Sequence, residues 1–323
     1  MTILLTGAAG FIGFHTAKRL LARGESVIGI DNLNAYYDPK LKDARLAQLE
    51  GQKGFTFHRC DIADGTALRA LPALSSVDRI IHLAAQAGVR YSIEEPRAYA
   101  DSNLVGHTEL LEIARHLDVK HMVYASSSSV YGANTKIPFA ESDRTDNPVS
   151  FYGATKKACE LLSESYARLY GLPLTGLRFF TVYGPYGRPD MAYMIFTRKI
   201  LAGETIDVFG EGNMGRDFTY VEDCADGIVR ALDHPPAKGP DDVPHEVFNL
   251  GNDTPERLGD LIGHIEQLLG QEAEKRYLPM QPGDVRETWA NIEKARTKLG
   301  YNPATDLKTG LAHFVAWYRD YYR

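Results

Sequence analysis

A tyrosine and a lysine four residues apart are the first candidates for chemistry in this chain. Tyr152 and Lys156 lie in a stretch with helical periodicity, so both side chains project from one face and an ammonium can sit beside a phenol. A free phenol has a pKa of about 10, and a neighbouring lysine favours the phenolate, which makes a base near neutral pH. A hydroxyl from the run Ser126 to Ser129 could share the proton of a substrate. The same spacing is common on helix surfaces, so the pair needs support from other residues.

A glycine-rich turn near the N-terminus gives that support. The turn contains Gly7, Gly10 and Gly13, with Phe11 and Ile12 before the last glycine, and it joins a predicted strand to a predicted helix. Glycines at this place permit a tight turn and a close approach of the backbone to a pyrophosphate, which the positive end of the helix then faces. The turn therefore predicts a dinucleotide site.

An acidic residue at the end of the second predicted strand selects the dinucleotide. Asp31 stands 18 residues after Gly13, where a carboxylate can accept both hydroxyls of an adenosine ribose and repel a 2′-phosphate. We therefore expect NAD rather than NADP. Asp61 and Ile62 could flank the adenine, although Asp-Ile-Ala-Asp is also a fair helix N-terminus. The remaining expected cofactor contacts are Asn32, Leu83, Ala84, Ala85, Tyr152 and Lys156.

The elements that must position these residues alternate in type. Strands are predicted at 3–6, 26–31, 55–60, 79–83, 121–126 and 174–180, and helices at 10–23, 40–49, 97–116 and 152–170. This order predicts an α/β fold with a doubly wound parallel Rossmann sheet. After about residue 180, runs of glycine and proline break the pattern. We expect an NAD-binding domain at 1–180 and a smaller substrate-binding lobe at 181–323, with 217–229 and 248–250 returning to the sheet or its flanks.

The amino-acid composition limits the expected binding partners of the chain and its cellular compartment. With 36 Lys and Arg against 42 Asp and Glu, the net charge of -6 provides no broad basic surface, so neither nucleic acid nor an anionic membrane is an expected partner. The three cysteines have no short spacing, so neither disulfides nor a metal site are predicted and a reducing cytoplasm fits best. No apolar run is long enough to span a bilayer, and the N-terminus leads directly into a strand, so neither export nor anchoring is expected.

Three further motifs carry a resemblance to a known family. They are His82-Leu-Ala-Ala-Gln-Ala-Gly-Val-Arg90, Phe179-Phe-Thr-Val-Tyr-Gly-Pro-Tyr-Gly-Arg-Pro-Asp-Met191 and Gln281-Pro-Gly-Asp-Val-Arg286. With the GxxGxxG turn, the chain resembles extended short-chain dehydrogenases/reductases, and within them the UDP-glucuronate 4-epimerases. The resemblance implies a catalytic set of Ser127, Tyr152 and Lys156, with Ser126 and Ser128 as one-residue alternatives. It also implies that Asn103 lines the cofactor pocket in a structural role.

The same resemblance implies a UDP-sugar substrate and a 4-keto intermediate. Tyr152 would take the proton of the 4-hydroxyl while C4 passes hydride to NAD, and hydride would return to the opposite face. A uronic acid that carries a ketone at C4 is a β-keto acid, and such acids lose carbon dioxide readily. The site must therefore restrain the carboxylate. The residues expected to do this are Ser127, Ser128, Thr181 and Arg188. The arginines expected near the diphosphate are Arg216, Arg286 and Arg90, of which Arg90 could instead pair with Glu94 or Glu95.

Other activities of the group stay open as alternatives. Dehydratases place an acidic pair after the catalytic hydroxyl, where this chain has Ser128 and Ser129, and decarboxylases have a glutamate at the second of these places. The alternatives are a UDP-glucose 4-epimerase, then a UDP-glucuronate decarboxylase, and last a non-enzymatic NAD-binding sensor. In relatives the two long helices form a homodimer contact. The candidate residues for that face, or equally for the core, are Leu104, Leu111, Leu161 and Leu162.

Overall fold

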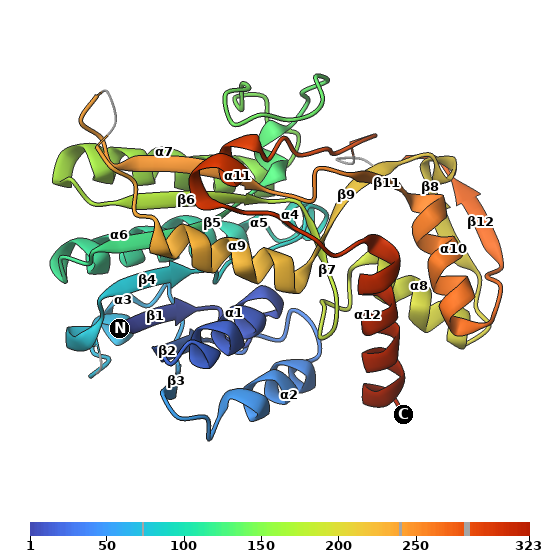
Figure 1. Ribbon diagram of the computed structural model, residues 1–323, viewed down its shortest axis with the longest axis horizontal. Coiled ribbons are helices and arrows are strands. Elements are labelled where there is room, and N and C mark those ends of the chain that lie inside the picture. Colours follow the sequence, from blue (N-terminus) through green and yellow to red (C-terminus); the bar gives the residue numbers. More distant parts are fainter. Residues whose placement is uncertain (73, 239–240, 281–284) are drawn as a thin grey trace.

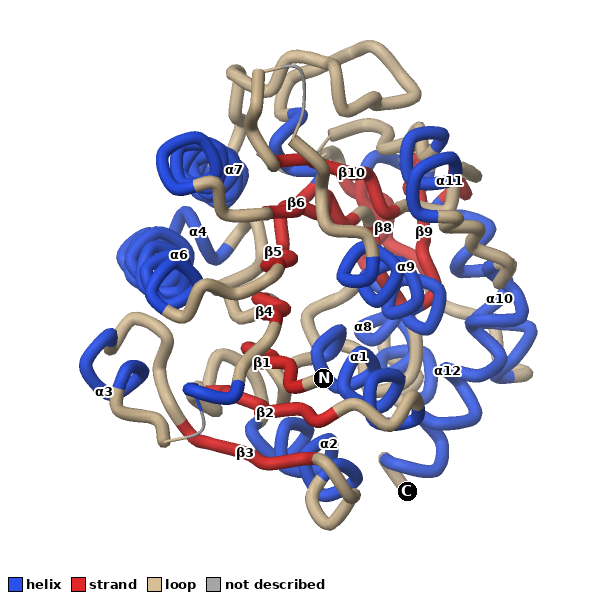
Figure 2. Tube along the Cα trace, turned by 60° about the vertical axis from the view of Figure 1, so that its left-hand side comes forward, coloured by secondary structure: helices blue, strands red, loops and turns tan. Residues whose placement is uncertain are grey.

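A seven-stranded parallel sheet forms the centre of the molecule (Figures 1 and 2). The computed structural model describes residues 1–72, 74–238, 241–280 and 285–323. The strands follow the order β10-β6-β5-β4-β1-β2-β3. Their bounds are β1 Thr2–Thr6, β2 Ser26–Asp31, β3 Phe55–Arg59, β4 Arg79–His82, β5 His121–Ser127, β6 Leu174–Phe179 and β10 His245–Leu250. Because the order reverses between β1 and β4, the sheet is doubly wound, as predicted.

The inner strands β1, β4, β5 and β6 are buried on both faces, which explains their apolar sequences. In β1, Ile3 and Leu5 belong to one hydrophobic cluster, whereas Leu4 belongs to the cluster on the opposite face. Successive side chains of a strand point to opposite faces, so a strand covered on both sides reads as a continuous apolar run. Such runs predicted the inner strands from the sequence, whereas β3, at the edge of the sheet, is only partly buried.

Helices cover both faces of the sheet (Figure 2). The first half contains α1 Phe11–Ala22, α2 Pro39–Leu49, α3 Gly65–Arg69, α4 Tyr91–Glu94, α5 Pro96–Tyr99, α6 Gly106–His116 and α7 Phe151–Tyr170. Helices α6 and α7 lie on one face, and α1 lies on the other beside α9 (Val221–Asp233). The α7 helix begins where the Ser150 hydroxyl accepts from the backbone N–H of Gly153 at 3.0 Å, and it ends at the left-handed Gly171.

One predicted helix differs from the observed structure. The segment 97–116 was expected to be continuous, but a π-helix at Ala100–Val105 separates α5 from α6. The wider turn contains Asn103, whose buried side chain bonds the backbone of Gln86 in the loop after β4. A π-turn of this kind is common near functional sites, and no sequence periodicity announces it.

The second lobe is built from two small sheets and the helices around them. One sheet has the order β11-β9-β7 and the other pairs β12 with β8. The bounds are β7 Thr181–Tyr183, α8 Ala192–Leu201, β8 Ile206–Phe209, β9 Gly215–Tyr220, β11 Pro255–Arg257, α10 Leu258–Leu269, β12 Lys275–Leu278, α11 Glu293–Leu299 and α12 Leu307–Tyr321. Figure 1 shows β8, β12 and α10 at the end of the molecule away from β1.

Part of the chain beyond residue 180 belongs to the central sheet. Strand β10, which contains 248–250, pairs with β6 in parallel, and α9, which contains 221–229, packs against α1, whereas 217–220 belong to β9 of the three-stranded sheet. The domain boundary at residue 180 stays a prediction, because β10 and α9 follow it in the sequence but pack with β6 and α1, which precede it.

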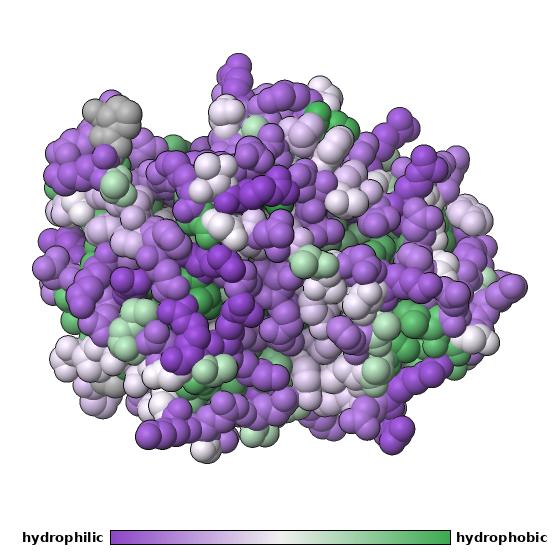
Figure 3. All heavy atoms as spheres, in the orientation of Figure 1, coloured by the Kyte–Doolittle hydropathy of each residue, from purple (hydrophilic) through white to green (hydrophobic). Residues whose placement is uncertain are grey.

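The face of the molecule drawn in Figure 3 is mainly hydrophilic. Among the described helices, none is long and apolar enough to cross a membrane.

Candidate active site

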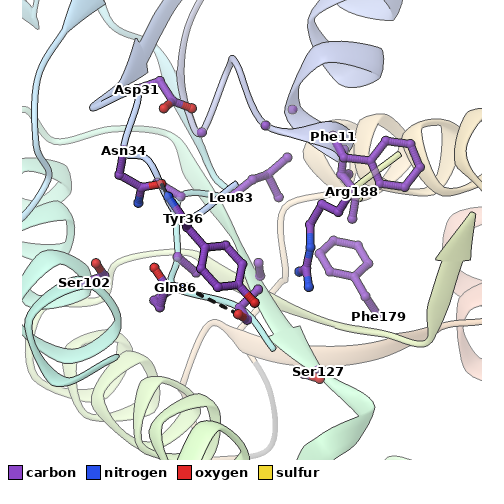
Figure 4. A pocket seen from close by; sticks show the side chains of 18 of the residues that line it. Phe11, Asp31, Asn34, Tyr36, Leu83, Gln86, Ser102, Ser127, Phe179 and Arg188 are labelled. Atoms are coloured by element: carbon purple, nitrogen blue, oxygen red, sulfur yellow. Dashed lines mark hydrogen bonds between the residues drawn. The ribbon is translucent and has the colours of Figure 1, made fainter. Parts of the chain in front are cut away.

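A cavity lies at the carboxyl ends of the central strands, near the point where the strand order reverses (Figure 4). This is the place at which open α/β sheets bind ligands. The predicted site residues that line it are Gly7, Gly10, Phe11, Ile12, Gly13, Asp31, Asn32, Ile62, Leu83, Ala84, Ala85, Ser127, Tyr152, Lys156 and Arg188. The fold therefore brings most of the predicted cofactor and catalytic residues to one space.

The glycine turn has the geometry that a pyrophosphate requires. Gly7 has a φ of +73°, and a Cβ atom on Gly13 would lie 2.0 Å from the carbonyl oxygen of Gly7. Only glycine fits at either place, so the turn brings the start of α1 close to β1. Gly10 caps α1 without a side chain, which leaves the first backbone N–H groups of the helix facing the cavity edge. These groups fit an anionic phosphate.

The end of β2 supplies the polar contacts expected for a ribose. Asp31 is buried, and its carboxylate accepts from the backbone N–H groups of Ala9 at 3.2 Å and Leu33 at 2.9 Å. Lys42, on the first turns of α2, lines the same cavity and donates to the carbonyl and side-chain oxygens of Asn34, both at 2.8 Å. Burial lowers the pKa of Lys42. Lys42 was not predicted from the sequence, because its place depends on how α2 packs beside β2.

Two predicted cofactor residues lie outside the cavity wall. Asp61 is exposed, and its carboxylate accepts from the Asn32 side chain and from the N–H of Ala63, each at 2.9 Å. Asp61 thus shapes the turn before α3, whose N-cap is Asp64, with a carboxylate that accepts from the N–H of Ala67 at 3.0 Å. Asn103 lies behind the wall, where its amide donates to Gln86 O at 3.1 Å and to the Thr155 hydroxyl at 3.0 Å. It ties the loop after β4 to α7, which is the structural role that the resemblance implies.

The predicted catalytic pair lies at the start of α7. Tyr152 and Lys156 both line the cavity, one helical turn apart. The Lys156 ammonium donates to the carbonyl oxygen of Ala125 at 2.9 Å, which anchors it against the end of β5. The Tyr152 ring meets Tyr99 edge-on with ring centroids 6.0 Å apart. Both groups are thus held by neighbours on other elements.

The serines of the run Ser126 to Ser129 differ in what their hydroxyl groups contact. Ser126 also lines the cavity, but its hydroxyl donates to Glu160 at 2.7 Å, and that buried carboxylate also holds Arg178. Ser127 lines the cavity and accepts from the N–H of Ser129 at 3.1 Å, which leaves its hydroxyl hydrogen for a ligand. Ser128 is not part of the cavity lining. The contacts favour Ser127 as the serine that meets a substrate.

Arg188 reaches the cavity from the loop between β7 and α8. Its guanidinium pairs with both oxygens of Asp190, with Nε to Oδ1 at 3.0 Å and Nη2 to Oδ2 at 2.6 Å. Although burial opposes ionisation, Arg188 lowers the pKa of Asp190. The Tyr36 hydroxyl donates to the same carboxylate at 3.1 Å, and burial together with Asp190 raises the pKa of Tyr36 to about 12. Figure 4 shows Tyr36 and Arg188 pointing into the cavity from opposite sides. Tyr36 was not predicted from the sequence.

The other predicted substrate residues lie away from this cavity. Thr181 begins β7 and does not line it. The Arg90 guanidinium stacks over the Phe209 ring at 5.6 Å, and Arg216 donates to the carbonyl oxygen of Arg286 at 3.3 Å. Arg216 and Arg286 are therefore neighbours, as a shared anionic ligand would need. Residues 281–284 of the third sequence motif lie outside the described residues.

Comparisons with known proteins agree on one family. The family described as "NAD dependent epimerase/dehydratase family" matches residues 3–251. UDP-glucuronate 4-epimerase 4 of Arabidopsis thaliana is 50% identical over all of this chain and 76% of its own length. A probable UDP-glucuronate 4-epimerase of Rhizobium meliloti is 47% identical, covering 100% of this chain and 98% of its own. The crystal structure of UDP-glucuronic acid 4-epimerase from Bacillus cereus, in complex with UDP-glucuronic acid and NAD, matches with a TM-score of 0.91 and 36% identity over the full length of both chains.

Proposed function

This chain belongs to the NAD dependent epimerase/dehydratase family, and from that premise we propose that it interconverts UDP-glucuronate and UDP-galacturonate with a tightly held NAD. One observation carries the proposal. The Arg188 guanidinium lines the same cavity as Tyr152, Lys156 and the glycine turn. A cation beside an acid–base pair fits a sugar that carries a carboxylate at C6.

The residues around the glycine turn fit NAD. Gly7, Gly10 and the start of α1 would hold the pyrophosphate, and Asp31 would accept the hydroxyls of the adenosine ribose. A 2′-phosphate at that place would meet the Asp31 carboxylate and be repelled. When bound, NAD supplies a hydride acceptor that can return the hydride to either face of a ketone at C4.

Tyr152 carries the proton in this proposal. Its phenolate takes the proton of the 4-hydroxyl as C4 becomes a ketone, and the phenol returns the proton to the inverted alkoxide. The Lys156 ammonium, fixed by the carbonyl oxygen of Ala125, lies one helical turn from Tyr152 on the wall of the same cavity. Ser127 donates a hydrogen bond to the oxygen at C4, where negative charge develops.

Arg188 restrains the substrate carboxylate. Decarboxylation of a β-keto acid is easiest when the breaking carbon–carbon bond stands perpendicular to the ketone plane, so a carboxylate held in another orientation is protected. Asp190 takes the Nε and Nη2 edge of the Arg188 guanidinium and so fixes its plane, which leaves the Nη1 side to donate to the substrate carboxylate. Arg188 and Ser127 line the cavity itself, and the share of Ser128 and Thr181 in the restraint stays a prediction.

The UDP moiety is expected at the second lobe. Arg216 and Arg286 are adjacent there, and Arg90 stacks on Phe209 nearby. Because the whole chain carries a net charge of -6, recognition of a doubly charged diphosphate must come from such local arginines.

We also propose a homodimer and a cytoplasmic location. Leu161 on α7 is 57% exposed, and Val105 beside α6 is 45% exposed, so the outer faces of these helices offer apolar surface to a second copy. Leu111 is fully buried in the core of its own chain and is excluded from that face. The three cysteines are buried free thiols, which suits a reducing compartment.

A product assay tests the proposal. The purified protein is incubated separately with UDP-glucuronate and UDP-glucose, without added NAD, and the products are identified by NMR. UDP-galacturonate formed from UDP-glucuronate supports both the reaction and a retained cofactor. Turnover of UDP-glucose alone would show a neutral-sugar epimerase instead, and a UDP-pentose as the main product would show a decarboxylase.

A further inference from the structure

Arg45 is a fully buried cation that joins two distant parts of the chain. Its Nη1 donates to the carbonyl oxygen of Ala9 at 2.8 Å and to the Tyr37 hydroxyl at 2.6 Å. Its Nε and Nη2 both donate to the carbonyl oxygen of Tyr186, at 3.1 and 2.6 Å. A single guanidinium thus forms hydrogen bonds to both the glycine turn and the loop that carries Arg188.

The contact with Ala9 holds the middle of the glycine turn. The N–H of Ala9 donates to Asp31, and its carbonyl oxygen accepts from Arg45, so this residue is fixed on both sides. Arg45 itself is not part of the cavity lining. Any effect of Arg45 on a ligand must therefore pass through the backbone of the turn or through its charge.

The contact with Tyr186 holds the loop before Arg188. Tyr186 has a φ of +58°, a left-handed conformation that is uncommon for a residue with a side chain, so its surroundings must stabilise it. The preceding carbonyl, of Pro185, lies 3.0 Å from Nε2 of His15 on α1. The Tyr186 ring packs against Phe14 at 5.1 Å. Helices α1 and α2 therefore hold both carbonyls that lead into Arg188.

The charge of Arg45 lacks a carboxylate partner in the described part of the chain. All the acceptors named above are neutral, namely two carbonyls and a phenol. A buried cation without an anion is costly, and an anion bound close by lowers that cost. The pyrophosphate expected against the glycine turn is such an anion.

We infer that Arg45 is a positioning residue that links retention of the dinucleotide to placement of Arg188. The inference rests on the proposed function, because it assigns the cavity beside Arg188 to a sugar carboxylate. It implies that one substitution on α2 weakens two contacts that lie on different elements, without touching either ligand.

The test compares Arg45→Gln with Lys40→Gln, an exposed position on the same helix. Three quantities are measured: the NAD content of the purified protein, the KM for UDP-glucuronate at saturating NAD, and the inhibition constant of UDP, which lacks the sugar carboxylate. For Arg45→Gln we expect about a tenfold loss of NAD retention and about a tenfold rise in KM, because several hydrogen bonds from a charged donor are lost. The inhibition constant of UDP should stay within about twofold, since UDP is expected at Arg216 and Arg286. Lys40→Gln should match the wild type in all three.

A conservative change separates charge from shape. Arg45→Lys keeps a cation but cannot reach both carbonyls with a planar fork, so NAD retention should recover while the KM for UDP-glucuronate stays raised. If Arg45→Gln does not fold, His15→Gln tests the same loop through Pro185 and should raise the KM about threefold without moving the constant for UDP.

Two outcomes overturn the inference. Arg45→Gln could retain NAD as the wild type does, or it could lose NAD while the KM at saturating NAD stays unchanged; either result would mean that the two contacts are not linked. For His15→Gln, an unchanged KM overturns it in the same way. Failure of the wild type to act on UDP-glucuronate would instead refute the proposed function, and the NAD content would still decide whether Arg45 supports the glycine turn.

Discussion

The glycine turn and the Arg188 loop face each other across one cavity, yet they are held in different ways. The turn is fixed by local backbone rules, since Gly7 needs a positive φ and Gly13 has no room for a side chain. The Arg188 loop is fixed by contacts from far along the chain, chiefly from Arg45 and His15 to its carbonyl groups. Local rules are visible in a sequence, whereas long-range contacts appear only once the chain has folded.

The two regions also differ in the groups that they offer to a ligand. The cofactor half uses backbone groups and one carboxylate, which suit a ligand common to many enzymes. The Arg188 loop uses a charged side chain whose direction depends on Asp190 and Tyr36, which come from different segments. Substrate choice is therefore expected to be easier to alter than cofactor choice, and substitutions on the two sides should differ in kind.

The largest effect is expected at the proton carrier that both sides share. Tyr152→Phe removes the hydroxyl that exchanges the proton and should lower kcat about 10³-fold, while NAD content stays near the wild-type value. Tyr170→Phe, at the exposed end of the same helix, is the matched control and should keep full activity. A Tyr152→Phe enzyme within tenfold of the wild type would remove Tyr152 from the mechanism.

A substitution at Gly13 tests the cofactor side alone. A Cβ atom there would overlap the Gly7 carbonyl, so Gly13→Ala should displace the turn and leave the purified protein with little NAD. Gly263→Ala, on α10 of the second lobe, meets no atom within 4 Å and should be stabilising by about 0.5–1 kcal/mol, because alanine favours a helix. The NAD content of the purified proteins measures the first effect, and thermal unfolding measures the second. Normal NAD content in Gly13→Ala would contradict the assignment of the turn.

Substitutions at Arg188 test the substrate side alone. Arg188→Gln should retain NAD but lower kcat/KM for UDP-glucuronate about 10²-fold and increase the share of UDP-pentose among the products, because the carboxylate is no longer fixed. Asp190→Asn weakens the ion pair that positions Arg188, so it should lower kcat/KM for UDP-glucuronate about tenfold. Arg198→Gln, at an exposed arginine on α8, serves as the control and should leave kcat/KM unchanged. Less epimer with no pentose at all would contradict the restraint assigned to Arg188.

The contrast between the two sides also explains what could be predicted from the sequence. The glycine turn, Asp31 and the Tyr152–Lys156 pair lie on regular elements whose periodicity or turn chemistry is local, and all of them line the cavity. Tyr36 and Asp190 were missed because they lie on loops that meet only in the folded chain, and Lys42 was missed because its place depends on how α2 packs beside β2. Ser128 and Thr181 were grouped with the site by motif alone, and neither lines the cavity.

The π-helix around Asn103 shows the same limit at the level of the fold. Hydrophobic periodicity gave the helix from 97 to 116 but not its widened turn, since an inserted residue is stabilised by the tertiary bonds of Asn103 to Gln86 and Thr155. Motif resemblance found Asn103 without explaining it. The structure supplies the reason, which is that the wider turn lets the amide join the loop after β4 to α7.

The smallest effect concerns the sheet itself rather than either loop. Burial lowers the pKa of His107 to about 3, and burial also lowers that of His121 and of His245 to about 4. The unfolded chain takes up these protons near pH 6.5, before the native state does, so the free energy of unfolding should fall as the pH falls from about 7 to 5. Each such histidine should contribute about 1–2 kcal/mol to that loss. His245→Gln can keep the contact with the Tyr124 hydroxyl without taking a proton, so urea unfolding at both pH values should show a shallower pH dependence than in the wild type. An unchanged slope would mean that His245 does not contribute, and that the acid sensitivity lies with the other buried histidines.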